Sequence, residues 1–172
     1  MLPTTEKKCK NPLMVGNYNN ALAVMVKVQV SKTVNAPQDK IFSVITDFEK
    51  LPTRFPNTYQ SLKVIERSAN SVTVEEDVMF GGRKIHQITK HVFEPQHRLR
   101  SEVMDGDTKG TVVEITLDPD SSGISKTKVS VSADLKAGKL GTMVGVFAKG
   151  KIKNGLEHRI EEFEKIVNQG SF

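Results

Sequence analysis

The segment from residue 139 to residue 168 restricts the possible folds more than any other part of this chain. Its second half carries large apolar residues at steps of four and three, which places them on one face of a helix: Ile152, Leu156, Ile160, Phe163 and Val167. Each such side chain stabilises a fold by roughly 1.5–3 kcal/mol when it is fully buried. A helix with five of them needs a large apolar partner, and a β-sheet is the natural one.

The first half of the same segment is rich in glycine. Gly141 and Gly145 alternate with larger apolar residues, although glycine costs roughly 1 kcal/mol relative to alanine inside a helix. One interpretation is close packing of backbone on a sheet, or two shorter helices in place of one. The other is that the glycines leave empty volume, and a dry apolar cavity is what a lipophilic ligand needs.

Strand-like alternation accounts for most of the remaining sequence. Valines alternate with polar residues from residue 26 to residue 34, which predicts a first strand with one buried face. Between residues 59 and 135, the sequence divides into six runs in which apolar and polar residues alternate. The turn signals that separate these runs are Ala69-Asn70, Gly81-Gly82, Pro95-Gln96, Asp105-Gly106 and Ser122-Gly123. Short connections of this kind join antiparallel neighbours. The chain therefore predicts seven strands in an antiparallel sheet.

Two short helices are expected after the first strand. Pro37 begins the first of them, and apolar residues at helical spacing continue it to Phe48. Pro52 and Pro56 leave room for one further turn. Since one face of the sheet is polar and the other apolar, the C-terminal helix must cover the apolar face. The expected fold class is α+β, with a curved seven-stranded sheet wrapped around the long C-terminal helix.

Composition indicates the compartment and the domain organisation of the protein. The chain has 172 residues, a formal charge of +5 and a single cysteine, Cys9. One cysteine forms no intramolecular disulfide, which favours a reducing compartment, and we expect the cytoplasm. Residues 1–24 lack periodicity and predict a loose N-terminal extension, with Met25 as a candidate start. Residues 25–170 are then one ligand-binding domain.

Two blocks of sequence resemble a known family. These are Val34-Asn35-Ala36-Pro37, Ile41-Phe42, Asp47-Phe48-Glu49-Lys50-Leu51-Pro52 and Phe55-Pro56 in the first block, and Gly106-Asp107, Gly110 and Ile115-Thr116-Leu117-Asp118-Pro119 in the second. Together with the order of elements, they resemble the polyketide cyclase and coenzyme Q-binding proteins of the START/Bet v 1-like (SRPBCC) superfamily. The resemblance implies a helix-grip fold with a ligand cavity. It carries over no catalytic residue and implies no cofactor.

Glu76 is the most informative polar residue in the strands. Strict alternation puts it on the same face as Val74 and Val78, where an unpaired carboxylate would be costly. A local bulge, or pairing with Arg83 or Lys84, would relieve that cost. Alternatively, the acid reaches into a cavity, where desolvation raises its pKa and suits it to bind a polar ligand group or move a proton.

The histidines do not predict a metal site. His86 and His91 are five residues apart on one expected strand and so point to opposite faces. No HExxH motif or cysteine pair accompanies them, and we expect no bound metal. Solvated or core-bonded histidines are the better interpretation.

A lysine-rich stretch without acids runs through the start of the C-terminal segment: Lys136, Lys139, Lys149, Lys151 and Lys153. A solvated helix face explains it most simply. The alternative is an anionic partner, either lipid head groups of a membrane surface or the phosphates of RNA.

Three functions are consistent with these features. The leading one is binding of a lipophilic small molecule, such as an isoprenoid, quinone, lipid or polycyclic compound. The second is a cyclase or dehydrase, in which Glu76 converges with His86 or Gln87. The third is a toxin-like module associated with RNA or the ribosome. The expected cavity residues are Phe42, Phe55, Val74, Glu76, Val78, Phe80, Ile115, Leu117, Val131, Gly141, Val144 and Gly145.

Overall fold

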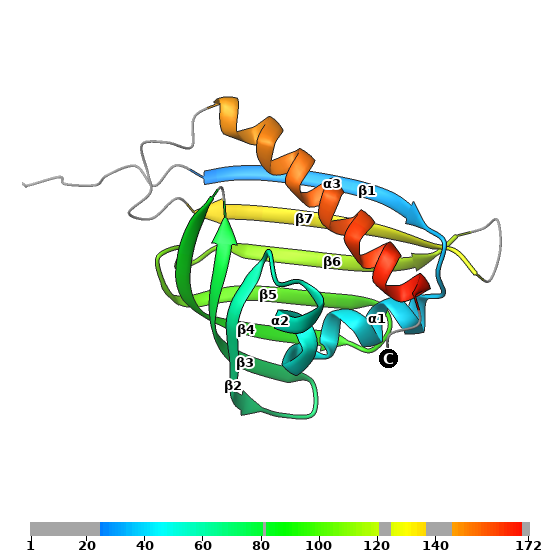
Figure 1. Cartoon of the computed structure of the whole chain (residues 1–172), viewed down its shortest axis with the longest axis horizontal. Coiled ribbons are helices and arrows are strands. Elements are labelled where there is room, and N and C mark those ends of the chain that lie inside the picture. The colour runs from blue at the N-terminus through cyan, green and yellow to red at the C-terminus, as the bar shows by residue number, and fades with distance from the viewer. Residues whose placement is uncertain (1–24, 81, 121–124, 137–145, 170–172) are drawn as a thin grey trace, which may run out of the picture.

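A seven-stranded antiparallel sheet forms the body of the molecule (Figure 1). The computed structural model describes residues 25–80, 82–120, 125–136 and 146–169. The elements in chain order are β1 (Met25–Val34), α1 (Gln38–Thr46), the 3-10 turn η1 (Phe48–Lys50), α2 (Leu51–Arg54), β2 (Tyr59–Arg67), β3 (Ser71–Phe80), β4 (Arg83–Glu94), β5 (Arg98–Gly106), β6 (Val112–Pro119), β7 (Thr127–Lys136) and α3 (Val146–Asn168). The order of strands across the sheet is β1-β7-β6-β5-β4-β3-β2.

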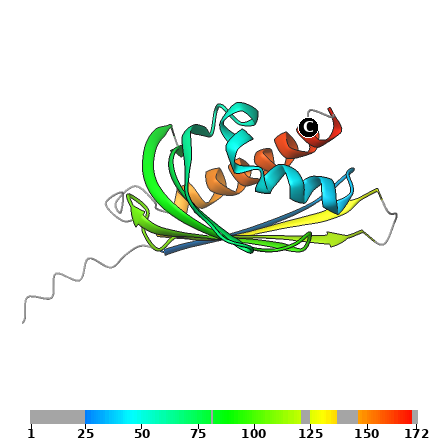
Figure 2. The ribbon, with the colours of Figure 1, turned by 90° about the horizontal axis from the view of Figure 1, so that it is seen from below.

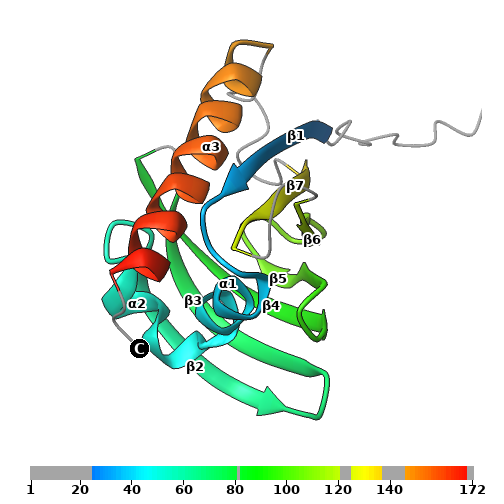
Figure 3. The same cartoon turned by 90° about the vertical axis from the view of Figure 1, so that its right-hand side faces the viewer.

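The sheet curves around α3 and the short helices. Figure 2 shows all helices on one side, with the β2–β4 end bent up beside them, and Figure 3 shows the sheet wrapping around α3. Register shifts between Tyr59 and Ser61, between Val64 and Glu66, and between Ile88 and Thr89 occur in the bent part. Extra residues of this kind bend a strand and increase its twist. Curvature leaves space between the inner face and the helices.

The apolar stripe of α3 faces the sheet, as its spacing predicts. Ile152, Ile160 and Val167 are buried, while Leu156 and Phe163 are partly buried. Polar contacts fix the C-terminal half of the helix to the end of β1. Lys32 Nζ lies 2.9 Å from Glu161 Oε1, and the Asn35 backbone N–H donates to Glu164 at 2.9 Å.

The short helices close one end of the sheet. α1 buries Ile41, Val44 and Ile45. Gln38, in its first turn, donates to the backbone carbonyls of Gln96 and Leu117 at 2.7 and 2.8 Å. The β4–β5 turn and strand β6 are thereby tied to the helix.

The predicted fold class is confirmed: seven antiparallel strands, two short helices after the first strand, and a long C-terminal helix over one face. The predicted turns at Ala69-Asn70, Pro95-Gln96 and Asp105-Gly106 fall between or at the ends of observed strands, whereas Gly81 and the predicted turn at Ser122-Gly123 lie outside the described residues. Gly141, Val144 and Gly145 lie outside the described residues.

Candidate functional site

A cavity of about 290 Å³ lies between the inner face of the sheet and α3. Side chains from the short helices, from β2 to β7 and from α3 line it, and most are aliphatic or aromatic. A second cavity of about 160 Å³ shares several of the same walls, among them Tyr59, Ile115, Leu156 and Phe163. The two cavities are therefore neighbours beneath one helix, and their combined size suits a small organic ligand.

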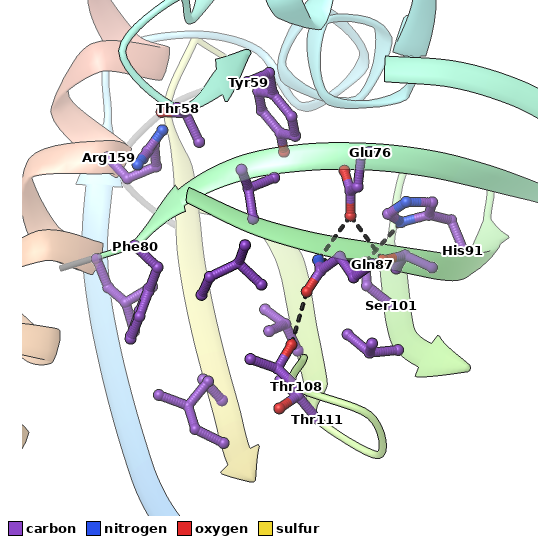
Figure 4. Close-up of a pocket in the computed structure, with 18 of the residues that line it drawn as sticks. Thr58, Tyr59, Glu76, Phe80, Gln87, His91, Ser101, Thr108, Thr111 and Arg159 are labelled. Atoms are coloured by element: carbon purple, nitrogen blue, oxygen red, sulfur yellow. Dashed lines mark hydrogen bonds between the residues drawn. The ribbon is translucent and has the colours of Figure 1, made fainter. Parts of the chain in front are cut away.

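A polar cluster on β3 and β4 lies within the mostly apolar lining (Figure 4). Glu76 is buried, with an exposed fraction of 4%. Its Oε1 accepts hydrogen bonds from the Thr89 hydroxyl at 2.6 Å and from the Gln87 amide at 2.8 Å. The Thr108 hydroxyl in turn donates to Gln87 Oε1 at 2.7 Å. These bonds hold the carboxyl group in one orientation inside an otherwise apolar wall.

Gly106 allows Thr108 to reach this cluster. Its φ of +104° is in the region that favours glycine, and a Cβ built there would lie 2.3 Å from the His86 carbonyl oxygen. The end of β5 can therefore approach the backbone of β4 beside Gln87, with which Gly106 is paired. The glycine of the Asp105-Gly106 turn signal thus positions a polar side chain of the site.

Burial controls the protonation of Glu76. Desolvation raises the pKa of its carboxyl group, although the hydrogen bonds from Thr89 and Gln87 act in the opposite direction. A carboxyl group with a raised pKa can remain protonated at a higher pH than an exposed one. It then serves as a hydrogen-bond donor or proton source in the cavity.

His91 forms a second buried polar position in the lining. Its Nδ1 lies 2.8 Å from the Ser101 hydroxyl, and its ring packs against Phe48 with centroids 4.6 Å apart. Nε2 is buried and has no hydrogen-bond partner among the described residues. Burial lowers the pKa of His91 to about 4, so the ring is neutral at physiological pH.

The two interpretations of Glu76 can now be distinguished. β3 and β4 pair without a register shift, with Glu76 opposite Gln87. Lys84 bonds to Asp77 on the other face at 2.8 Å. Glu76 therefore faces the cavity, and neither a bulge in β3 nor a pairing with Lys84 explains its position. Gln87 converges on it as the cyclase hypothesis requires.

The two histidines of β4 face opposite sides of the sheet, as predicted. His86 is exposed, with its Nδ1 2.9 Å from Asp77, so it does not converge with Glu76 as that hypothesis allowed. His91 is buried within the lining.

The other predicted cavity residues occupy different positions. Glu76, Val78, Phe80 and Ile115 line the first cavity, and Ile115 and Val131 line the second. Phe42, Phe55, Val74 and Leu117 line neither. Phe42 packs edge-on against Phe93, and Phe55 against Phe163, while Val74 and Leu117 are completely enclosed by the core.

Several lining residues were not predicted. Thr89, His91, Tyr59 and Arg159 are polar side chains whose inward direction depends on the register of β2 and β4 and on the rotation of α3. Their position on β4 could have indicated the inward direction of Thr89 and His91, because alternate residues of a strand share a face and residues 85, 87, 89 and 91 therefore point to the same side.

The lysine-rich stretch is only partly described. Lys136 lines the first cavity, whereas Lys149, Lys151 and Lys153 are exposed on α3. Its contact with an anionic membrane surface or with RNA stays a prediction. No described helix has the length and apolar character to cross a bilayer. Within the described ranges, no three His, Cys, Asp or Glu side chains are grouped as metal ligands would be.

A curved antiparallel sheet that holds an apolar cavity under a C-terminal helix defines the helix-grip class of proteins. The model of one protein family, polyketide cyclase / dehydrase and lipid transport, matches residues 25–164. The chain belongs to this family.

Solved structures share the fold at low sequence identity. A protein from Thermus thermophilus has a TM-score of 0.72 and 17% identity, over 86% of this chain and 100% of that one. A START superfamily protein from Mycobacterium smegmatis has a TM-score of 0.72 and 21% identity, over 83% and 97%. The Zhui aromatase/cyclase from Streptomyces sp. R1128 has a TM-score of 0.67 and 15% identity, over 85% and 95%. The search of curated proteins found no match.

Proposed function

We propose that this protein binds a mostly apolar small molecule that carries a neutral polar group. The observation that supports this most directly is the cavity, whose lining is mostly apolar and includes a set of polar side chains, several of them oriented by hydrogen bonds. Such a lining favours a lipophilic molecule because burial of apolar surface supplies most of the affinity, and a few polar groups fix its orientation. An isoprenoid, a quinone, a lipid or a polycyclic compound fits this description.

The Glu76 cluster is the proposed contact for the neutral polar group. A ligand carbonyl or hydroxyl placed there would complete the hydrogen bonding of a buried carboxyl group, of which Oε1 alone accepts hydrogen bonds from the described residues. Membership of a family described by lipid transport and polyketide cyclisation agrees with this ligand class.

A neutral fluorescent probe, N-phenyl-1-naphthylamine, tests the cavity. Val113→Phe fills space within the lining of both cavities. We expect it to weaken probe binding about tenfold or more, because the added ring occupies ligand volume. The matched control is Val112→Phe, one residue earlier on β6 and absent from both linings, which should leave affinity unchanged. Equal affinity in all three proteins would contradict binding in this cavity.

A cyclase or dehydrase is the second candidate function. It is favoured by the position of Glu76 in the cavity lining, where burial raises the pKa of the carboxyl group and so favours its protonated form. Native mass spectrometry of the protein purified from cells distinguishes the two functions. A carrier should retain the same molecule in wild type and in Glu76→Gln. A dehydrase should retain in the variant a molecule heavier by one water.

A further inference from the structure

A second polar position lies where the two cavities meet. Thr58, Tyr59 and Arg159 line both of them, from the start of β2 and from the middle of α3. Figure 4 shows Arg159 and Thr58 on one side of Tyr59, and Glu76 on its other side. This position is therefore distinct from the carboxyl group on β3.

The guanidinium group of Arg159 is incompletely paired. Its Nη1 is shielded from solvent and has no hydrogen-bond partner among the described residues. Its nearest acid is Glu162, whose Oε2 lies 3.8 Å from Nε, longer than a hydrogen bond. A shielded N–H of a charged group without a partner is unfavourable. The arginine thus has donor capacity that the protein itself does not use.

Tyr59 supplies a second unused donor. In the part of the chain that the structure describes, no hydrogen bond reaches its hydroxyl group. Burial and then the charge of Glu76 raise the pKa of Tyr59, while Arg159 acts in the opposite sense. The hydroxyl group therefore stays protonated and lies within the electrostatic reach of both charged residues.

We propose that the ligand is an amphiphile with an acidic group, held as its carboxylate by Arg159 and the Tyr59 hydroxyl. This inference rests on the proposed cavity function and adds the chemical class of the ligand. A guanidinium group offers a planar set of N–H donors that matches a carboxylate. The apolar chain of the ligand would fill the aliphatic lining on either side of this junction.

The Glu76 cluster is unsuitable for the same carboxylate. A second acid beside Glu76 would place two carboxyl groups together in an apolar environment, where one must remain protonated. Arg159 and Glu76 come from different walls of the cavity, α3 and β3, so the anion is assigned to Arg159 and the neutral polar group of the ligand to Glu76.

Displacement of N-phenyl-1-naphthylamine by two ligands of equal chain length tests the inference. Dodecanoate and 1-dodecanol differ in their head group, and only dodecanoate is an anion at neutral pH. We expect wild type to bind dodecanoate about tenfold or more tightly than dodecanol, which is the range of one charged hydrogen bond. Arg159→Met keeps the apolar stem and should abolish that preference while probe affinity stays within about twofold.

Two further variants separate a specific site from net charge and from misfolding. Lys136→Met removes the other lysine or arginine of the lining and should leave the preference intact. Tyr59→Phe removes one hydroxyl group and should lower the affinity for dodecanoate by about threefold to tenfold, without lowering the affinity for dodecanol. Unchanged probe binding in each variant shows that the cavity is still formed.

The outcomes distinguish this inference from the function on which it rests. Probe binding with equal affinities for dodecanoate and dodecanol would overturn the inference and leave the cavity function standing. A preference that survives in Arg159→Met, or that disappears in Lys136→Met instead, would also overturn it. Absence of probe binding, together with no heat of dodecanoate binding by calorimetry, would overturn both.

Discussion

The Thr89 hydroxyl group donates a 2.6 Å hydrogen bond to Glu76 Oε1 across the β3–β4 pair, inside the apolar cavity. The two residues are diagonal neighbours, because Glu76 is paired with Gln87 and Thr89 with Val74. A diagonal contact of this kind requires both strands to keep an uninterrupted register. The chemistry of the site therefore depends on strand pairing as much as on the identity of the acid.

Glu76→Gln should change the pH dependence of stability. In wild type the folded-state pKa of Glu76 is raised above its ordinary value of 4.5. As pH rises above about 4.5, the unfolded chain releases this proton first, so the free energy of unfolding falls until the folded-state pKa is passed. The amide does not titrate, and the variant should gain stability relative to wild type as pH increases.

Urea midpoints measured at several pH values from about 4 to about 8 check this expectation. Thr89→Val provides a second comparison, because it removes a hydrogen bond that favours the ionised form. It should extend the fall in stability to higher pH. Parallel curves for wild type and Glu76→Gln would show that the carboxyl group titrates alike in both states.

His91→Gln should remove a loss of stability on acidification. Burial holds the folded-state pKa of His91 at about 4, below its usual 6.5. Between these values the unfolded chain binds more protons, so stability is lost as pH falls from about 6.5 to about 4. The loss amounts to about 3 kcal/mol once the pH is below about 4. Unfolding at pH 7 and at pH 4 measures it, and the variant should show less dependence on pH.

His86→Gln serves as the control with the opposite sign. The hydrogen bond to Asp77 raises the pKa of His86 on the outer face. The stabilisation of the folded protein by protonated His86 is present at acid pH and is lost as pH rises through the folded-state pKa. Its removal should therefore weaken the protein more at acid than at neutral pH. The same change of slope in both histidine variants would contradict the assignment of faces.

Phe55→Ala should destabilise the protein more than Phe163→Ala. The two rings meet edge-on with centroids 4.6 Å apart, but only Phe163 lines the cavities. Phe55 is packed on all sides, with an exposed fraction of 3%, and we expect a loss of about 3–5 kcal/mol. Phe163 already lacks packing partners on its cavity side, so Phe163→Ala should lower the free energy of unfolding by about 2–3 kcal/mol.

Chemical denaturation measures both losses. Lys165→Ala, on the exposed side of α3, should change stability by no more than about 0.5 kcal/mol. Glu162 is a poorer control because its carboxylate lies near His158 and Arg159. A larger loss for Phe163 than for Phe55 would indicate that the cavity wall is filled in solution.

Deletion of residues 1–24 should shift the thermal midpoint by only a few degrees. The family match begins at residue 25, where β1 also starts. The deleted segment offers little apolar periodicity for packing. Thermal unfolding of the two chain lengths, followed by circular dichroism, measures the shift. A drop of more than about ten degrees would mean that the segment contributes to the fold.

The elements of this fold were predictable because each has a strong local pattern. The period-two alternation in β1, β3 and β7 and the stripe on α3 reflect the burial of one face, which acts residue by residue. The inward position of Glu76 followed from the same alternation. Phe42 and Phe55 were expected in the cavity, yet they line neither cavity and pack instead against Phe93 and against the cavity residue Phe163. Hydrophobicity does not distinguish a residue of the filled core from one of the open wall.

Contacts between distant segments were beyond the sequence patterns. Arg159 lines the cavities together with Tyr59 only because of how α3 is rotated about its own axis. A charged residue within an amphipathic helix is most often solvent-facing, and nothing local indicates otherwise. Similarly, the bond from Thr108 to Gln87 depends on a turn whose geometry is fixed by the approach of Gly106 to β4.

The fixed orientation of Gln87 has a consequence for ligand choice. Because Thr108 donates to its oxygen, its nitrogen must face Glu76, and Glu76 Oε1 then accepts two hydrogen bonds. When the carboxyl group is neutral, its proton is therefore carried by Oε2. The site then offers an O–H donor, which needs a ligand atom with a lone pair to accept the hydrogen bond. We therefore expect the site to prefer a ketone, quinone or ester oxygen to an N–H group of the same shape.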